Sequence, residues 1–275
     1  MRRVVMSFNS VPMTSTAATL AQAMGIESPK LAGEPIKQVL SLVKKYSKSG
    51  KCQRVLIYNP DAIAQWLYQK YTAEFAPVME RTMMTIPMLA SFPPVTPVCF
   101  ATMFSGAIPK VHGIEVYEKK LVKIDTLFDA LPRQGKKTTL IARTGSSMGT
   151  IFTGRPIDYH NYDNDEEITQ QGLKAISEDQ HDVVVVYNMD YDDNIHDSEP
   201  ESKSSYEAMC RHIRDFARLV DCACKAWQQY DTLFLFAPDH GIHKTILGDG
   251  NHFCDSPEDM NILHFYGFKA AGESR

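Results

Sequence analysis

Acidic and histidine side chains gather just after three apolar segments of this sequence. Each segment has the pattern of a buried strand, and a further histidine lies a short glycine-rich stretch after the last one. The side chains concerned are Asp61, Asp192, His196, Asp239, His240 and His252. Carboxylate oxygen and imidazole nitrogen both bind borderline divalent cations well, so no cysteine is needed. Three aspartates and three histidines therefore suit a pair of divalent metal ions.

Each of these side chains alone is weak support for a metal site. An aspartate after a strand is more often a turn or cap residue, and a loop histidine is more often simply hydrogen-bonded. Their coincidence is more telling, because open α/β sheets place ligand-binding groups just beyond the carboxyl ends of their strands. Two metals about 4 Å apart can hold the attacking and departing oxygens of an in-line displacement at phosphorus.

Thr96 has two interpretations. It precedes Pro97 and a mostly apolar run that closes at Gly106, a favoured helix start with Thr96 as N-cap and proline as the first helical residue. On this pattern alone a cap is the simpler role. The same helix terminus can hold phosphate, however, and metal coordination turns a threonine hydroxyl into a nucleophile. Beside a two-metal site, the sequence favours the nucleophile.

A sheet is needed to bring these residues together. Four segments are almost continuously apolar, which is typical of parallel strands covered by helices on both faces: 54–59, 138–142, 182–188 and 232–237. Between them lie amphipathic patterns, of which the clearest steps by three and four from Tyr206 to Tyr230. The alternation predicts a three-layer α/β/α sandwich with a mostly parallel central sheet.

The length of 275 residues suits one catalytic domain, 1–275. We expect an N-terminal helical segment, 1–50, with two helices within 11–49. A small lid around 144–170 is a further possibility. Its tyrosines, Tyr159 and Tyr162, could stack a base or sugar, although a solvated loop fits the pattern as well.

Composition limits the partners. A net charge of −4 gives no electrostatic reason to expect nucleic-acid binding. No apolar run is long enough to predict a membrane span, and the basic start lacks the apolar core of a signal peptide. The six cysteines are scattered and mostly lie in apolar patterns. We therefore expect reduced cysteines and a cytoplasmic protein.

These motifs together resemble the alkaline phosphatase superfamily, and within it the type I phosphodiesterase/nucleotide pyrophosphatase family. The stretch P-P-V-T-P-V-C-F-A-T-M-F-S-G resembles that family's nucleophile segment. Y-N-M-D-Y-D-D-N-I-H, A-P-D-H-G-I-H and G-N-H-F resemble its metal segments. The match runs in order from about residue 54 to residue 267.

The resemblance implies two sets of metal ligands. The first set is Asp61, Asp239 and His240, whose metal also binds the Thr96 oxygen, and the second is Asp192, His196 and His252. Thr96 would attack phosphorus and form a covalent phospho- or nucleotidyl-threonine that water then hydrolyses. Zinc best matches the ligand types, and manganese is the alternative.

Some positions depart from the family pattern or compete for a role. The aspartate of the first strand, Asp61, lies two residues beyond Asn59, which could itself hydrogen-bond the phosphoryl oxygens. Phe253 replaces a glycine after the last histidine and Glu199 replaces another, so both add bulk at the pocket mouth. Asp190 and Asp193 flank Asp192, and the resemblance selects Asp192 because it lies four residues before the histidine.

The sequence thus predicts a two-metal phosphoesterase that acts on a small-molecule phosphodiester or nucleotide pyrophosphate. Alternatives are a phosphomonoesterase, a phosphonate hydrolase, or a catalytically silent metal-binding module that kept the fold. A sulfatase is disfavoured because T-P-V-C-F lacks the Cys/Ser-x-Pro-x-Arg context of those enzymes. A cofactor-independent phosphoglycerate mutase is disfavoured because it uses serine and a large inserted domain.

Overall fold

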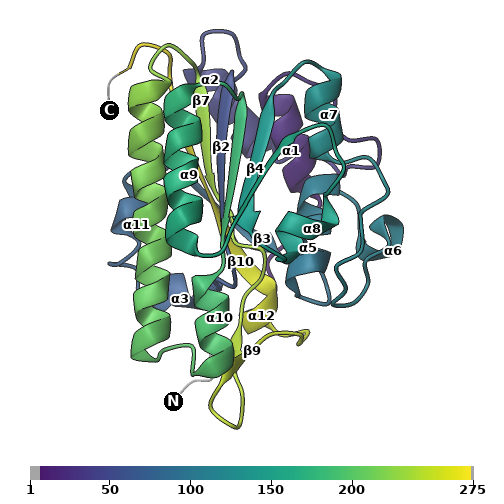
Figure 1. The fold of residues 1–275 in the computed structure, drawn as a ribbon, viewed down its shortest axis with the longest axis vertical. Coiled ribbons are helices and arrows are strands. Elements are labelled where there is room, and N and C mark those ends of the chain that lie inside the picture. The colour runs from purple at the N-terminus through teal and green to yellow at the C-terminus, as the bar shows by residue number, and fades with distance from the viewer. Residues whose placement is uncertain (1–6, 274–275) are drawn as a thin grey trace.

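The computed structural model describes residues 7–273. They form a three-layer α/β/α sandwich around an eight-stranded sheet with the order β1-β3-β10-β7-β2-β6-β4-β5 (Figure 1). The strands are β1 (Val11–Pro12), β2 (Arg54–Pro60), β3 (Met84–Leu89), β4 (Thr138–Arg143), β5 (Asp158–Tyr162), β6 (Val183–Asn188), β7 (Thr232–Phe236) and β10 (Asn261–Lys269). A separate hairpin joins β8 (His243–Lys244) to β9 (Gly250–Asn251).

The four apolar segments of the sequence are confirmed as β2, β4, β6 and β7. They lie next to one another in parallel, with Val55 opposite both Val183 of β6 and Leu233 of β7. All residues of β6 and β7 are buried, as expected for strands covered on both faces. Because the strands are parallel, their carboxyl ends meet at one edge of the sheet.

Four strands of the central sheet lie outside those apolar segments. β10 runs antiparallel between β3 and β7, so it is the strand that reverses direction within this sheet. β5 pairs in parallel with β4 at the sheet edge. Residues 158–162, in the segment expected to include a small lid, therefore belong to the sheet.

Helices cover both faces of the sheet. One face carries α1 (Ser15–Ala23), α2 (Lys37–Tyr46), α5 (Thr96–Ser105), α7 (Leu127–Arg133) and α8 (Ser147–Ile151). The other carries α3 (Gln65–Lys70), α4 (Ala76–Met79), α9 (Asp165–Glu178) and α11 (Lys203–Ala226). The two helices expected within 11–49 are confirmed as α1 and α2. The remaining helices are α6 (Pro109–His112), α10 (Asp190–Asp197) and α12 (Pro257–Met260).

The long amphipathic pattern forms α11. Its residues Ile213, Phe216 and Val220 are buried against the sheet, which confirms the predicted face. The helix ends at Ala226, so Tyr230 lies beyond it. Among residues 7–273, no helix is long and apolar enough to cross a membrane.

Candidate metal centre

The six predicted ligands meet at the carboxyl edge of the sheet, the end where α10, α12 and β9 gather in Figure 1. They form two groups, and within each group the ligand atoms lie within 4.8 Å of one another. One group is Asp61, Asp239 and His240, and the other is Asp192, His196 and His252. Parallel pairing of β2, β6 and β7 explains the convergence, since these strands end side by side.

The first group is centred on the His240 ring. Its Nε2 atom lies 3.3 Å from Asp61 Oδ1 and 3.4 Å from Asp239 Oδ2. Its Nδ1 atom is 3.1 Å from the Gly241 carbonyl oxygen. A carbonyl only accepts, so Nδ1 carries the proton and Nε2 presents a lone pair to the two carboxylates.

The second group is centred on Asp192. Asp192 and His196 lie one turn apart on α10, so they share a helix face. Asp192 Oδ1 is 3.5 Å from His196 Nε2 and 3.6 Å from His252 Nε2. The Nδ1–H of His252 donates to the Pro94 carbonyl over 2.8 Å, which leaves its Nε2 lone pair free toward Asp192.

Burial and neighbouring charges shift the pKa values of the three aspartates. Burial raises the pKa of Asp61, and the charges of Asp239 and Asp192 raise it further. The pKa of Asp239 is raised to about 7, mainly by burial. Burial also acts to raise the pKa of Asp192, but the neighbouring histidines, His196 above all, outweigh burial and lower it. The two carboxyls of the first group therefore favour their neutral forms unless a cation lies beside them.

Buried carboxylate oxygens without hydrogen-bond partners indicate whether cations fit the two ligand groups. Asp61 Oδ1, Asp192 Oδ1 and Asp239 Oδ2 are buried without a hydrogen-bond partner. Such buried orphan oxygens are rare, since each loses its water without replacement. Here each faces an imidazole lone pair, an arrangement that a cation between them makes favourable. The donor set therefore fits two divalent cations, one in each group.

The structure bears on both predicted roles of Thr96. The expectation that it is the N-cap is wrong by one position, because Val95 is the N-cap and Thr96 is the first residue of α5. The reason is that Val95 still has extended backbone angles while Thr96 is already helical. Its hydroxyl makes no cap bond and instead lies 3.3 Å from His240 Nε2.

Asp190 and Asp193, the competitors of Asp192, have another partner. Both carboxylates pair with the Arg143 guanidinium, which stands at the end of β4. Asp192 faces the two histidines instead. The geometry therefore favours Asp192 as the ligand.

The two predicted substrate contacts differ in exposure. Asn59 is fully buried in β2, and its amide donates to the Ala237 carbonyl over 2.7 Å. Phe253 is 48% exposed, and its ring stacks on the His252 ring with centroids 5.0 Å apart. Both remain predictions as substrate contacts, and Phe253 is the one that solvent can reach.

Sequence reasoning missed two tyrosines. Tyr187 is fully buried in β6, and its hydroxyl donates to Asp61 Oδ2. Its position next to the carboxyl end of a predicted strand is the only sequence signal. Tyr117 is half-exposed in the loop after α6, and its pKa is raised by burial and by the charges of Asp61 and Asp192. The charges of both carboxylates reach Tyr117, so its hydroxyl lies near the candidate centre.

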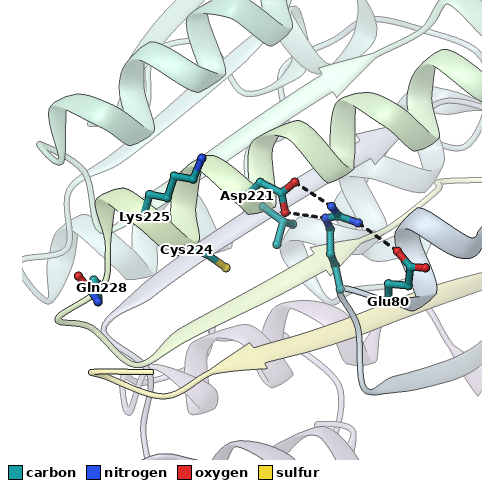
Figure 2. Close-up of a pocket in the computed structure, with 7 residues that line it drawn as sticks. Glu80, Asp221, Cys224, Lys225 and Gln228 are labelled. Atoms are coloured by element: carbon teal, nitrogen blue, oxygen red, sulfur yellow. Dashed lines mark hydrogen bonds and ion pairs between the residues drawn. The ribbon is translucent and has the colours of Figure 1, made fainter. Parts of the chain in front are cut away.

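A surface groove of about 790 Å³ lies elsewhere, beside the C-terminal half of α11. Its Arg81 guanidinium forms ion pairs with Asp221 and Glu80. Figure 2 shows dashed lines from these two labelled carboxylates to the same side chain. Because α11 leads into the amino end of β7, this groove lies away from the carboxyl edge. The charges of Glu80, Arg81 and Asp221 are paired with one another, and the groove holds none of the six predicted ligands.

Comparison with solved structures shows which known proteins share this fold. No protein-family model and no curated protein matches the sequence. Human ectonucleotide pyrophosphatase/phosphodiesterase 5 matches in structure with a TM-score of 0.57 and 17% identity, over 70% of this chain and 58% of that chain. Phosphonoacetate hydrolase from Sinorhizobium meliloti matches with a TM-score of 0.52 and 16% identity, over 70% and 57%. The chain therefore has the alkaline phosphatase-like fold of these structures.

A third structure matches a larger share of this chain. The C-terminal periplasmic domain of the phosphoethanolamine transferase from Campylobacter jejuni has a TM-score of 0.58 and 12% identity, over 82% of this chain and 83% of that chain. The chain spans less than two thirds of the length of the first two structures. At these identities the likeness establishes the fold, and the chemistry must be argued from the residues of this chain.

Proposed function

We propose that this protein is a two-metal phosphoesterase that hydrolyses phosphodiesters or nucleotide pyrophosphates through a covalent intermediate at Thr96. The observation that carries the proposal is the position of the Thr96 hydroxyl. It lies at the start of α5, 3.3 Å from His240 Nε2, in the group that contains Asp61 and Asp239. Of the structural neighbours, one is named a pyrophosphatase/phosphodiesterase, and its murine counterpart has been solved with AMP.

The two ligand groups supply the metals. Asp61, Asp239 and His240 would hold one divalent cation, and Asp192, His196 and His252 the other. Zinc is our proposed metal because the ligands are carboxylate and imidazole, with manganese as the alternative. Bound there, the cations would act as Lewis acids that favour the threonine alkoxide and draw charge from the phosphate oxygens.

The chain itself provides the nucleophile and a cradle for the phosphate. Thr96 Oγ attacks phosphorus and displaces the first ester oxygen, and water then cleaves the phospho-threonine and restores the hydroxyl. The first turn of α5 adds backbone N–H groups that lack intrahelical acceptors, together with the positive end of the helix dipole. These groups orient the phosphoryl oxygens before the attack.

The surroundings favour a diester over a monoester. The terminal oxygens of a monoester dianion need cationic partners, but Arg143 beside the second group is already paired with Asp190 and Asp193. The second ester group of a diester instead needs an apolar or stacking wall. Phe253 and Tyr117, both about half-exposed near the centre, offer aromatic rings for such a wall.

Hydrolysis of paired esters tests the proposal. Bis(4-nitrophenyl) phosphate and 4-nitrophenyl phosphate are compared with zinc or manganese for wild type, Thr96→Ala and Thr96→Ser, with bound metal measured in each. We expect turnover mainly of the diester, loss of at least about a hundredfold in Thr96→Ala, and partial activity in Thr96→Ser. Unchanged turnover in a metal-loaded Thr96→Ala variant would refute the threonine mechanism. Bound metal without turnover of either ester would favour the silent module.

A further inference from the structure

A second cluster of potential ligands lies outside the six residues of the metal centre. It consists of His243 in β8, Cys254 after β9 and Asp259 in α12, with ligand atoms within 4.8 Å of one another. Cys254 Sγ is 3.9 Å from His243 Nε2, and His243 Nδ1 is 2.8 Å and 3.0 Å from the two oxygens of Asp259. Nothing in the proposed hydrolysis uses these three side chains.

Asp259 hydrogen-bonds both other residues of the cluster. Its side chain is fully buried, and its carboxylate also accepts the Cys254 backbone N–H over 2.8 Å. Because the carboxylate accepts from Nδ1, the His243 proton lies on that atom and Nε2 presents its lone pair toward the cysteine sulfur. A carboxylate behind a histidine in this manner is the usual support of a metal-binding imidazole.

The spacing of the two outer atoms suits a shared cation. Zinc–sulfur and zinc–nitrogen bonds of about 2.3 Å and 2.05 Å at a tetrahedral angle span about 3.6 Å from sulfur to nitrogen. The separation of 3.9 Å differs from this by a few tenths of an ångström. Cys254 is also the exposed cysteine of the six, so water can complete the coordination.

We propose that Cys254 Sγ and His243 Nε2 form a third cation site, for zinc or a softer thiolate-binding divalent ion, with Asp259 as the orienting carboxylate. The site differs in chemistry from the two-metal centre because it contains a thiolate ligand, which soft cations prefer.

The position of this site gives it a structural consequence. Cys254 follows the ligand His252 by two residues, and His243 follows His240 by three. The Asp259 carbonyl also accepts the Gly241 N–H over 2.7 Å. A cation at the third site would therefore tie together the two segments that deliver His240 and His252.

Titration of the metal-free full-length protein with Cd²⁺ tests this proposal directly, because the centre built from Asp and His gives no thiolate-to-metal charge-transfer band. We expect wild type to show that near-ultraviolet band and Zn²⁺ to displace it. Cys254→Ser should abolish the band, and His243→Gln should weaken the Cd²⁺ affinity at least about tenfold. Cys210→Ser, which changes a half-buried cysteine of α11, should leave the band unchanged.

Two results would overturn the third site: absence of the band in wild type with excess Cd²⁺, or its persistence in Cys254→Ser. The Asp61→Asn/Asp192→Asn double variant separates this site from the two-metal centre. We expect that variant to lose esterase activity and keep the band. Loss of the band there would mean that the thiolate site depends on the main centre, which would contradict an independent third site.

Discussion

Replacement of Tyr187 by phenylalanine tests how the first ligand group is held. The substitution removes one hydroxyl and keeps the ring, which packs edge-on against Phe100 with centroids 5.0 Å apart. The hydroxyl is the donor to Asp61 Oδ2, while Asp61 Oδ1 has no hydrogen-bond partner. Tyr187→Phe therefore leaves both oxygens of a fully buried carboxylate without a donor.

Loss of the Tyr187 hydroxyl should weaken metal binding. The Tyr187 hydrogen bond lowers the pKa of Asp61 against the raising effect of burial. Without this bond the carboxyl holds its proton more tightly, and a cation must compete with that proton. Loss of such a supporting contact typically weakens metal binding about 10- to 100-fold, or about 1.4 to 2.7 kcal/mol. We expect Tyr187→Phe to fall in this range.

Competition with a chromophoric chelator measures the zinc affinity of each variant. Tyr266→Phe is the matched control, because Tyr266 is also fully buried but its hydroxyl has no hydrogen-bond partner. In an Asp61→Asn background, Tyr187→Phe should add little, since the charged acceptor is gone. Equal zinc affinity in wild type and Tyr187→Phe would refute the assignment of Asp61 as a ligand supported by Tyr187.

Substitutions at three further positions probe other features. Phe253 has φ 121°, a backbone angle that glycine adopts freely. The Phe253→Gly variant should therefore have an unfolding free energy about 1 kcal/mol higher than that of Phe253→Ala in urea titrations. Equal values for the two variants would disprove backbone strain. A Cβ on Gly241 would lie 2.2 Å from the Glu258 carbonyl oxygen, so Gly241→Ala should lower the unfolding free energy by about 2 kcal/mol, and an unchanged melting temperature would contradict this. Burial lowers the pKa of His212 to about 3, so the unfolded chain binds a proton that the folded chain refuses, and wild-type stability should fall as pH drops from about 6.5 toward 3. His212→Gln should reduce that slope by up to about 1.4 kcal/mol per pH unit, and an unchanged slope would rule out His212 as its source.

The central strands were predictable because burial on both faces leaves a nearly continuous apolar run. The run V-V-V-V of β6 needs no context to be recognised, and its position predicted where Asp192 and His196 would lie. The apolar run N-I-L-H-F-Y-G-F of β10 also indicates a strand, with His264 near the core, but the sequence does not show that this strand runs antiparallel to its neighbours. β5 consists largely of polar residues at the sheet edge, where one side faces no further strand, so it reads as a loop.

The candidate metal centre was predictable as a set of residues but not as a network of contacts. Candidate ligands are recognised by residue type and by their place after strands, and both are visible in the sequence. The contact of Tyr187 with Asp61 joins residues that are far apart in sequence, and it depends on how β2 and β6 pair. The Asp259 support of His243 likewise depends on where α12 folds back, which no local pattern encodes.

The pairing of β2 with β6 also bears on how the protein reaches its native state. Pro60 lies opposite Asn188, and Asp61 follows directly. A slip of one residue between these strands would move Asp61 by about 3.3 Å relative to Asp192, whereas metal ligands tolerate about 0.2 Å. A misaligned sheet would still bury its apolar strands, but it could not complete both ligand groups. Metal binding would therefore favour the correctly aligned native state over a misaligned one. Cations that bind only the correctly aligned chain draw the population toward it by mass action.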